Sequence, residues 1–509
     1  METTKKKKKF SFPTAFTVLF IVLILACVLT YVVPAGSYAE LQYDAAGTGA
    51  NEFTLTQPDG EQKILPATQK TLDELGISTD IEKFTNGDIN KPIGIPGTYE
   101  KVEQNPQGIG AFIKSPIDGV YDSIDIILFV LIIGGVIGIL DYSGAFNAGI
   151  AALSRVTKGR EYILIVVITI LIAAGGTTFG LAEETIALYP ILIPVFLAAN
   201  YDALVCIAAI YMGSSIGTMM STVNPFSVVI ASNAAGINFT EGMGFRGAGL
   251  VLGTAITILY ILRYANKIKK DPTKSLIYAD RDKIVAKYSH DGEAPALTFR
   301  YKLALIIFLL AFVVMVWGVS RQGWWFGEMT ALFLVVAVIL GVLLGIPEKV
   351  FVDKFIGGAG ELIGVGLIIG VARAVNMILD AGAVSDTILF KLSSLVGGMN
   401  PSIFIILMMF IFVILGFFIN SSSGLATLSI PIIAPLADAV GLPREVIISA
   451  YIFGLGMISF ITPTGLILAT LDLVDVTYDK WLKFVMPLMG ILTVLSIILL
   501  LIQANVSAF

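Results

Sequence analysis

Long apolar runs separated by shorter polar stretches set the pattern of this chain. Seven runs have the length that spans a bilayer core, which is about 20 residues at a rise of 1.5 Å per residue. They lie near 12–33, 123–140, 245–262, 303–320, 329–346, 361–380 and 482–502. The pattern predicts an all-α polytopic membrane protein. Together with the interrupted segments described next, it predicts about nine full spans plus two re-entrant hairpins.

One further apolar segment turns back at a small, polar tip. It is apolar over 162–173 and again over 185–199, with a Gly-rich break at 175–180 and the pair Glu183-Glu184 between the two arms. Arms of about 12–15 residues form roughly 20 Å of helix, which is too short to cross a core of about 30 Å. We therefore predict a re-entrant hairpin at about 161–200.

A second hairpin is predicted at about 402–440, with arms near 402–418 and 427–440. Its tip reads Asn420-Ser421-Ser422-Ser423-Gly424. Non-helical backbone is tolerated at membrane depth only where protein or a water-filled cavity satisfies its polar groups. Both tips are therefore expected inside the bundle.

Each hairpin is followed by an apolar segment that contains a break. The segment 203–236 is interrupted at Asn224-Pro225, and the segment 443–471 is interrupted at Thr462-Pro463-Thr464-Gly465. Proline removes a backbone donor and breaks a helix. Paired broken helices at corresponding positions point to a binding site near the bilayer midplane.

The two halves of the chain resemble each other at a nearly constant offset. Pro190 and Pro431 are 241 residues apart, and Tyr211 and Tyr451 are 240 residues apart. Counting spans gives the first hairpin an entry from the cytoplasm and the second an entry from outside. The chain is therefore predicted to consist of two inverted-topology repeats.

Charge assigns the polar segments to the two sides of a membrane. An excess of Lys and Arg marks the cytoplasmic side. Residues 5–9 are five lysines, whereas 37–118 holds thirteen Asp and Glu against six Lys. We predict a multi-pass protein of the cell (plasma) membrane, with a cytoplasmic N-terminus and an extracytoplasmic C-terminus. The segment 37–118 lies outside, either as a small subdomain or as a solvated loop.

The first apolar run is interpreted as a retained span. A signal peptide has an apolar region of about 7–15 residues, which this run exceeds. The predicted organisation is a cytoplasmic N-terminus with the first span (1–36), the extracytoplasmic loop (37–118), the rest of the first repeat (119–264), a basic cytoplasmic linker (265–302), a linking span (303–325) and the second repeat (326–509).

Composition supports a membrane protein and excludes several function classes. Hydrophobic residues make up 56% of the chain and charged residues only 14%, against about 45–50% and 25% in soluble proteins. A net charge of −5 gives no indication of a nucleic-acid partner. Cys27 and Cys206 lie in apolar runs and are expected to pack there, without a disulfide or a metal. The single histidine, His290, lies in a polar loop, which argues against a His metal site or proton relay.

No enzyme motif is found either. The chain has no P-loop and no His-Glu-x-x-His motif, so neither ATP hydrolysis nor zinc catalysis is indicated. We expect no enzymatic activity and no cofactor.

Glu183 and Glu184 are the most informative candidate site residues. An ionisable side chain at bilayer depth costs about 2.5 kcal/mol or more, so such residues are functional by default. The alternative is a structural ion pair inside the bundle. Neighbouring side chains on a helix point in different directions, so we expect at most one of the two to contact the substrate.

Arg373 lies inside an otherwise apolar span. It has two equally supported roles: it binds a substrate carboxylate through a forked hydrogen bond, or it neutralises a glutamate within the bundle. The remaining candidates are small polar residues at the tips and breaks, which bind substrate groups and small cations in such proteins but also serve helix packing. They are Thr185, Asn224, Ser227, Asn420, Ser421, Ser422, Thr462 and Thr464.

Several short motifs carry a resemblance to a known family. They are Phe10-Ser11-Phe12-Pro13-Thr14, Val33-Pro34-Ala35-Gly36-Ser37-Tyr38, Gly180-Leu181-Ala182-Glu183-Glu184-Thr185 and Thr222-Val223-Asn224-Pro225-Phe226. With them the chain resembles the YfcC branch of the anaerobic C4-dicarboxylate carrier (DcuC-type) family, over essentially its whole length. The resemblance implies the fold of the ion-transporter superfamily, in which two hairpins meet at the substrate. A homodimer is expected only by analogy with that superfamily.

The resemblance also bears on the substrate. Similar proteins of lactic-acid bacteria are arginine/ornithine antiporters, and the branch is named for dicarboxylates or for basic amino acids. Sodium/dicarboxylate symporters of the superfamily carry Ser-Asn-Thr at both hairpin tips. This chain instead has Ala182-Glu183-Glu184-Thr185 and Asn420-Ser421-Ser422. The difference leaves sodium coupling unresolved, and acids at a tip suit a cationic substrate.

Three hypotheses follow from the sequence. The leading one is a secondary transporter of basic amino acids that exchanges arginine for ornithine by alternating access. The second is a carrier of C4-dicarboxylates or other organic anions, which Arg373 favours. The third is a channel or a non-transporting receptor, against which the two hairpins argue.

Overall fold

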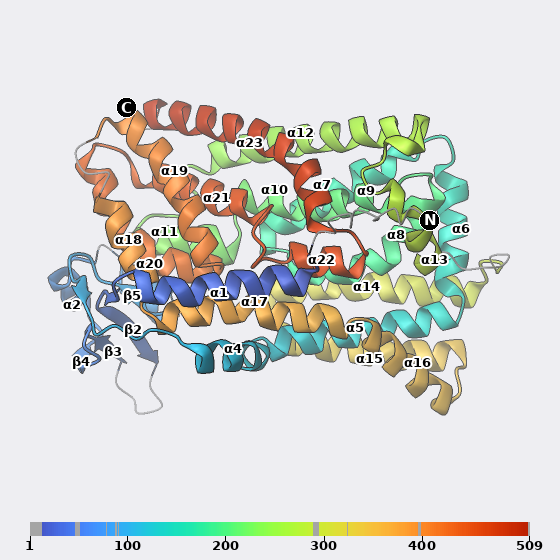
Figure 1. The fold of residues 1–509 in the computed structure, drawn as a ribbon, viewed down its shortest axis with the longest axis horizontal. Coiled ribbons are helices and arrows are strands. Elements are labelled where there is room, and N and C mark those ends of the chain that lie inside the picture. Colours follow the sequence, from blue (N-terminus) through green and yellow to red (C-terminus); the bar gives the residue numbers. More distant parts are fainter. Residues whose placement is uncertain are drawn as a thin grey trace, which may run out of the picture.

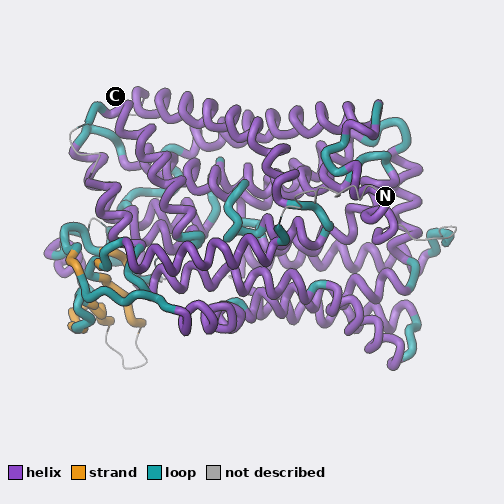
Figure 2. The backbone as a smooth tube through the Cα atoms, viewed as in Figure 1, coloured by secondary structure: helices purple, strands orange, loops and turns teal. Residues whose placement is uncertain are grey.

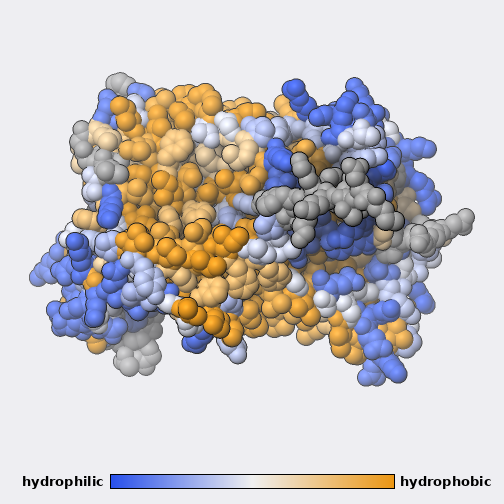
Figure 3. Space-filling model, in the orientation of Figure 1, coloured by the Kyte–Doolittle hydropathy of each residue, from blue (hydrophilic) through white to orange (hydrophobic). Residues whose placement is uncertain are grey.

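The computed structural model describes residues 13–45, 51–77, 79–86, 89, 91–288, 295–322, 324–394 and 399–506. These residues form a helical membrane protein with a small β subdomain at one end (Figure 1). Ten of the described helices are long and apolar enough to cross a bilayer. Figure 3 shows a broad apolar band between polar surfaces at the two ends of the long axis. The predicted class, an all-α polytopic membrane protein, is confirmed. His290 lies outside the described residues.

The segment that follows helix α1 (Ala15–Val32) folds into a compact subdomain. Strands β1 (Gly36–Ser37) and β6 (Glu100–Lys101) form an antiparallel pair. A second antiparallel sheet has the strand order β4-β3-β2-β5, and its strands are β2 (Glu40–Ala45), β3 (Asn51–Thr56), β4 (Gln62–Pro66) and β5 (Ile93–Gly94). Leu41, Phe53 and Phe84 are buried in a core of its own. Of the two options that the sequence left open, the structure has the subdomain.

The other elements of the first half are helical. They are α2 (Gln69–Glu74) and α3 (Glu82–Thr85) of the subdomain, then α4 (Ile109–Asp122), α5 (Ile124–Tyr142), α6 (Ala145–Thr157), α7 (Tyr162–Phe179), the 3₁₀ turn η1 (Glu183–Leu188), α8 (Tyr189–Ala198), α9 (Ala203–Ile207), η2 (Ala208–Met212), α10 (Gly213–Met219), η3 (Pro225–Val229), α11 (Ile230–Ala234) and α12 (Met243–Lys270). Helix α4 begins inside the segment predicted as a loop and runs past its predicted end at 118. Its exposed isoleucines at 109, 113 and 117 recur at helical spacing.

The linker and the second half follow. They comprise the turns η4 (Pro272–Lys274) and η5 (Tyr278–Asp280), and the helices α13 (Arg281–Tyr288), α14 (Phe299–Gln322), α15 (Phe326–Leu344), α16 (Glu348–Glu361), α17 (Ile363–Ala381), α18 (Ser385–Ser394), α19 (Pro401–Phe418), α20 (Ser422–Ala439), α21 (Arg444–Ser459), α22 (Ile467–Leu473) and α23 (Tyr478–Val506). The second arm of the second hairpin begins at Ser422, five residues before the predicted start at 427. Helix α16 was not predicted as a separate element.

The first arm of the first hairpin is longer than predicted. Helix α7 has 18 residues and runs through Gly175 and Gly176 to Phe179. Neither glycine ends the helix. Gly176 instead lets α10 approach closely, since a Cβ on it would lie 2.7 Å from the backbone oxygen of Ser214. Small residues at such contacts are typical of membrane helix pairs. The turn comes at Gly180, whose φ of 75° is left-handed.

Both ends of this hairpin lie at the same end of the molecule. Before α7, Glu161 forms a 2.9 Å ion pair with Lys269 of α12. After α8, Asp202 accepts hydrogen bonds from Ser275 (2.6 Å) and from Tyr264 (2.8 Å). Glu161 and Asp202 thus bind the same stretch of chain, the one that leads into the linker. The segment 161–200 therefore enters the bundle and returns.

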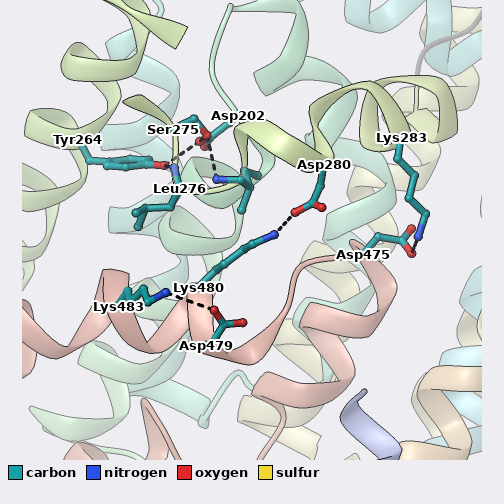
Figure 4. Close-up of polar contacts among 11 residues, drawn as sticks. Asp202, Tyr264, Ser275, Leu276, Asp280, Lys283, Asp475, Asp479, Lys480 and Lys483 are labelled. Atoms are coloured by element: carbon teal, nitrogen blue, oxygen red, sulfur yellow. Dashed lines mark hydrogen bonds and ion pairs between the residues drawn. The ribbon is translucent and has the colours of Figure 1, made fainter. Parts of the chain in front are cut away.

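The linker docks on the second half through charged contacts (Figure 4). Lys283 and Lys287 of α13 bind the two carboxylate oxygens of Asp475 at 2.6 and 2.8 Å. Lys480 of α23 reaches Asp280 in the same region. These contacts connect the linker to the end of α22 and the start of α23.

The two halves pack with a reciprocal pattern. Helix α4 packs on α17 and α5 packs on α16, while α7 pairs with α10 and α19 pairs with α21. Helix α23 ends at the side of the molecule that carries the β subdomain (Figure 1). The inverted repeat, its boundaries and the assignment of the two sides stay predictions.

Candidate functional site

A cavity of about 550 Å³ lies where the hairpin tips and helix breaks meet. Figure 2 shows loop segments at this depth, in the interior of the helical bundle between α21 and α22. Ten of the eleven residues proposed from sequence line this one cavity. They are Glu183, Glu184, Thr185, Asn224, Arg373, Asn420, Ser421, Ser422, Thr462 and Thr464.

Ser227 is the exception. It lies in η3, one turn after the break in the first broken helix, and it does not line the cavity. Its side chain is buried, and its Oγ has no hydrogen-bond partner among the described residues. The break turns the chain so that Asn224, and not Ser227, faces the cavity.

The tip of the first hairpin is held by hydrogen bonds to its own backbone. The Oε2 atom of Glu184 accepts from the amide of Ala182 at 3.1 Å. Thr185 donates from Oγ1 to the carbonyl of Ala182 at 2.6 Å. Ser214 of α10 donates to the carbonyl of Leu181. The backbone freed by the turn is therefore satisfied within the protein.

The two glutamates differ in their surroundings. Glu184 is buried, with 9% of its surface exposed, and its carboxylate is engaged with the tip backbone. Glu183 is half-buried against the cavity. In the described part of the chain neither carboxylate forms an ion pair with Lys or Arg. The alternative of a structural ion pair therefore finds no partner here, and of the two glutamates Glu183 is the one whose carboxylate is more available to a ligand.

Asparagines join each hairpin to its neighbouring broken helix. Asn224 donates from Nδ2 to the carbonyl of Gly176 at 3.1 Å, and its Oδ1 accepts from the amide of Phe226 at 2.9 Å. In the second half, Asn420 donates from Nδ2 to the carbonyl of Thr464 at 2.9 Å. Each break is thus held against a hairpin by a side-chain amide.

The remaining polar residues of the second tip also contact one another or the backbone. Ser421 caps α20, because its Oγ accepts from the amide of Gly424 at 3.1 Å. Tyr451 donates from its hydroxyl to the carbonyl of Ser422 at 2.6 Å. The hydroxyls of Thr462 and Thr464 lie 2.8 Å apart. These residues of the second half thus add hydroxyls to the cavity wall that the acidic tip of the first hairpin also lines.

Arg373 pairs with Asp122, the last residue of α4. The side chains of Arg373 and Asp122 remain 42% and 40% exposed, and both residues line the cavity. Neutralisation of a bundle glutamate, one of the two roles proposed from sequence, is therefore not found. Arg373 keeps access to a ligand while its charge is shared with Asp122.

Sequence reasoning missed several lining residues. Asp125 also lines the cavity and accepts a 3.1 Å hydrogen bond from Nε1 of Trp325. Lys91 reaches it from the β subdomain, and Asn376 lies one turn after Arg373 on α17. Asp122 and Asp125 could have been found as acids at the start of an apolar run. Nothing near Lys91 in the sequence indicates its place.

The charges on the cavity wall are unbalanced. The acids are Asp122, Asp125, Glu183 and Glu184, and the bases are Lys91 and Arg373. Four acids against two bases leave an excess of two carboxylates when all are ionised. A cationic ligand would offset this excess, because opposite charges attract more strongly away from bulk water.

Comparison with known proteins places the chain among transporters. The family model described as DcuC, C4-dicarboxylate anaerobic carrier, matches residues 12–505. A protein of Haemophilus influenzae, described only as uncharacterized, is 48% identical over 99% of both chains. A protein of Escherichia coli K12 described as a putative basic amino acid antiporter, YfcC, is 29% identical over 97% of this chain and 96% of its own.

Two solved structures are also similar. Neisseria gonorrhoeae MtrF, described within a class of antimetabolite efflux pumps, covers 97% of this chain and 96% of its own, at 15% identity and a TM-score of 0.39. The Alcanivorax borkumensis YdaH transporter covers 97% of this chain and 99% of its own, at 14% identity and a TM-score of 0.39.

Proposed function

The chain belongs to the DcuC family of C4-dicarboxylate anaerobic carriers and is a secondary transporter, and from this premise we propose that it exchanges basic amino acids, with arginine against ornithine as the leading pair. The observation that carries the proposal is the carboxylate of Glu183, which lines the cavity without an ion-pair partner in the described part of the chain. The E. coli relative described as a putative basic amino acid antiporter supports the same substrate class.

The charge of the cavity supports this choice of substrate. Arginine and ornithine carry a cationic side chain at neutral pH, because its pKa lies well above 7. Burying such a cation requires a charged or hydrogen-bonding partner. Glu183 offers one from the tip of the first hairpin, and the hydroxyls of Ser422 and Thr464, which line the same cavity, offer further acceptors.

The arrangement of the site supports alternating access. The cavity lies between two hairpins and two broken helices, which is where secondary transporters with discontinuous helices bind their substrates. The Asn224 and Asn420 contacts tie each hairpin to a broken helix. We infer that each pair moves as a unit when the cavity changes the side to which it opens.

The proposal is tested by exchange in proteoliposomes. Vesicles loaded with ornithine should take up labelled arginine, and vesicles loaded with buffer should not. Glu183→Gln should abolish the uptake, whereas Glu348→Gln, a change at an exposed residue of α16 away from the cavity, should leave it intact. Absence of ornithine-driven arginine uptake by the unmodified protein would reject the proposal.

A second candidate is a carrier of C4-dicarboxylates. Two cations, Lys91 and Arg373, line the cavity, and the name of the family points to the same substrates. The same vesicles loaded with succinate and given labelled succinate decide between the two. Succinate exchange without arginine exchange would establish the second candidate.

A further inference from the structure

One lysine of the β subdomain lines the cavity of the membrane domain. Lys91 lies just before strand β5, in a subdomain that the sequence places outside the membrane. It lines the same cavity as Asp122 and Arg373. The transport cavity is therefore completed by a residue from outside the helical bundle.

Contacts with three helices hold the subdomain in this place. Thr79 donates from Oγ1 to the carbonyl of Asn233 in α11 at 3.0 Å. The amide of Tyr38 donates to Asp386 of α18 at 2.9 Å. A Cβ on Gly94 would lie 3.1 Å from the carbonyl of Leu428 in α20, so β5 approaches this helix closely. Strand β5, which begins two residues after Lys91, thus packs against the bundle.

Lys91 and Arg373 together create a local excess of positive charge. The carboxylate of Asp122 accepts a hydrogen bond from Nε of Arg373, and its charge raises the pKa of Lys91. The terminal amino groups of Arg373 form no hydrogen bond with the described part of the chain. Burial and the charge of Arg373 lower the pKa of Lys91, and Asp122 only partly opposes this. An additional anion between the two cations would relieve their repulsion.

Helix α17 also carries a hydrogen-bond acceptor without a partner, the side chain of Asn376, close to Arg373. Asn376 follows Arg373 by three residues on α17, so the two side chains share one face of the helix. Both line the cavity. The Oδ1 atom of Asn376 is buried and has no hydrogen-bond partner among the described residues. A buried acceptor without a partner costs about 1–3 kcal/mol, which a bound ammonium group would recover.

We propose that Lys91, Arg373 and Asn376 form a subsite for the α-amino-acid head group. Lys91 and the terminal amino groups of Arg373 bind the α-carboxylate, and Asn376 Oδ1 accepts from the α-ammonium group. The cationic side chain of the substrate then extends toward Glu183. This inference rests on the proposed function and names the part of the substrate that each pole of the cavity recognises.

The subsite predicts which compounds the transporter rejects. A site that binds a carboxylate with charged donors discriminates against an analogue without it, because the donors are then left unpaired. The protein should therefore select basic amino acids over the amines formed by their decarboxylation. The β subdomain would then contribute to selectivity through Lys91.

The test compares two inhibitors of ornithine-driven arginine uptake. Arginine and agmatine share the guanidinium group, but agmatine lacks the carboxylate. In the unmodified protein, arginine should inhibit at concentrations at least tenfold lower than agmatine. Lys91→Gln should raise the inhibitory concentration of arginine about tenfold, the loss expected for one charge-assisted hydrogen bond, and leave that of agmatine within twofold. Lys91→Arg should restore most of the preference.

A matched control separates this effect from a general disturbance of the subdomain. Lys63 lies on β4 of the same subdomain, is exposed and does not line the cavity. Lys63→Gln should leave both inhibitory concentrations unchanged. The subsite is rejected, and the proposed function stands, if the Lys91→Gln variant still exchanges arginine and its inhibition by arginine and by agmatine is weakened equally or not at all. If the unmodified protein exchanges no arginine, the proposed function fails first.

A second variant tests the proposed contact of Asn376 with the α-ammonium group. It also keeps the subsite testable if Lys91→Gln does not fold. Asn376→Ala should narrow the preference for arginine over 5-guanidinovalerate, which lacks only the α-amino group. The inhibitory concentration of 5-guanidinovalerate itself should stay within twofold. An unchanged preference would overturn the assignment of Asn376.

Discussion

Asn420 donates a hydrogen bond from Nδ2 to the carbonyl of Thr464 over 2.9 Å, and so joins the tip of the second hairpin to the break of the following helix. Thr464 lies within the non-helical stretch between α21 and α22, where carbonyls lack helical partners. The contact therefore both satisfies freed backbone and positions the cavity wall.

Asn420→Ala should reduce exchange strongly at a small cost in stability. Leaving the Thr464 carbonyl unpaired costs about 1–3 kcal/mol, and the tip loses its attachment to the break. The measurement is the initial exchange rate together with the thermal midpoint of the purified protein. Asn400→Ala is the matched control: it removes the cap of α19 away from the cavity, so it should lower the midpoint by a similar amount and spare exchange.

Glu183 and Glu184 should respond differently to the loss of charge. Glu183→Gln should reduce exchange more than tenfold, because the cavity then loses a carboxylate that has no ion-pair partner among the described residues and that, unlike Glu184, does not accept from the amide of Ala182. Glu184→Gln should have a smaller effect, because an amide oxygen can still accept from the amide of Ala182. Initial rates of labelled arginine uptake check both. Two variants with normal rates would show that the acidic tip does not bind the substrate.

Exchange of arginine for ornithine should not respond to membrane potential. Both substrates carry one net positive charge at neutral pH, so one-for-one exchange moves no net charge. A potential acts on a moved charge with about 2.3 kcal/mol per 100 mV. The measurement is exchange under potassium-diffusion potentials of either sign, with and without sodium. A strong dependence on potential, or an absolute need for sodium, would point to an ion-coupled carrier.

Asp386 should make the stability of the protein depend on pH. It lies at the start of α18 beside β1, where burial raises the pKa of its carboxyl group from 3.8 to about 6, although hydrogen bonds from Tyr38 and Ser37 lower it. Between about pH 4 and pH 6 the folded state keeps a proton that the unfolded state has lost. The stability contributed by this group therefore falls as the pH rises through this window.

The check is the thermal midpoint at pH 4.5 and pH 7. Between these two pH values the thermal midpoint of the unmodified protein should fall further than that of the Asp386→Asn variant, because the asparagine has no proton to release. Equal changes in the two proteins would show that Asp386 does not titrate in this range.

The orientation of the chain can be tested with accessibility tags. A tag in the β3–β4 turn at Gly60 should react from outside intact cells, because the acidic subdomain is predicted to be extracytoplasmic. A tag at Ser275 in the basic linker should react only after permeabilisation. A cytoplasmic Gly60 would overturn the predicted sides and the inverted repeat that was deduced from them.

Several features of the fold were predictable from local sequence. Apolar runs such as α5, α15 and α23 lie close to their predicted bounds, because a bilayer core requires a minimum apolar length of every spanning helix. The breaks at Asn224 and Thr462 were also found, because proline removes a backbone donor wherever it lies. The glycines at 175 and 176 were wrongly predicted to break the helix, since a glycine in an apolar run can instead allow a close helix contact, as Gly176 does with α10.

The sequence by itself determined the class of protein and the residue types at the centre of the bundle. Solvation by lipid acts on each segment separately, so spans, tips and uncompensated acids such as Glu183 can be identified one at a time. Only the tertiary structure decided that Lys91 from the β subdomain and Asn376 from α17 share a cavity with Arg373. Lys91 joins the two residues of α17 through packing between segments far apart in the chain, and no local pattern of hydrophobic and polar residues encodes such contacts.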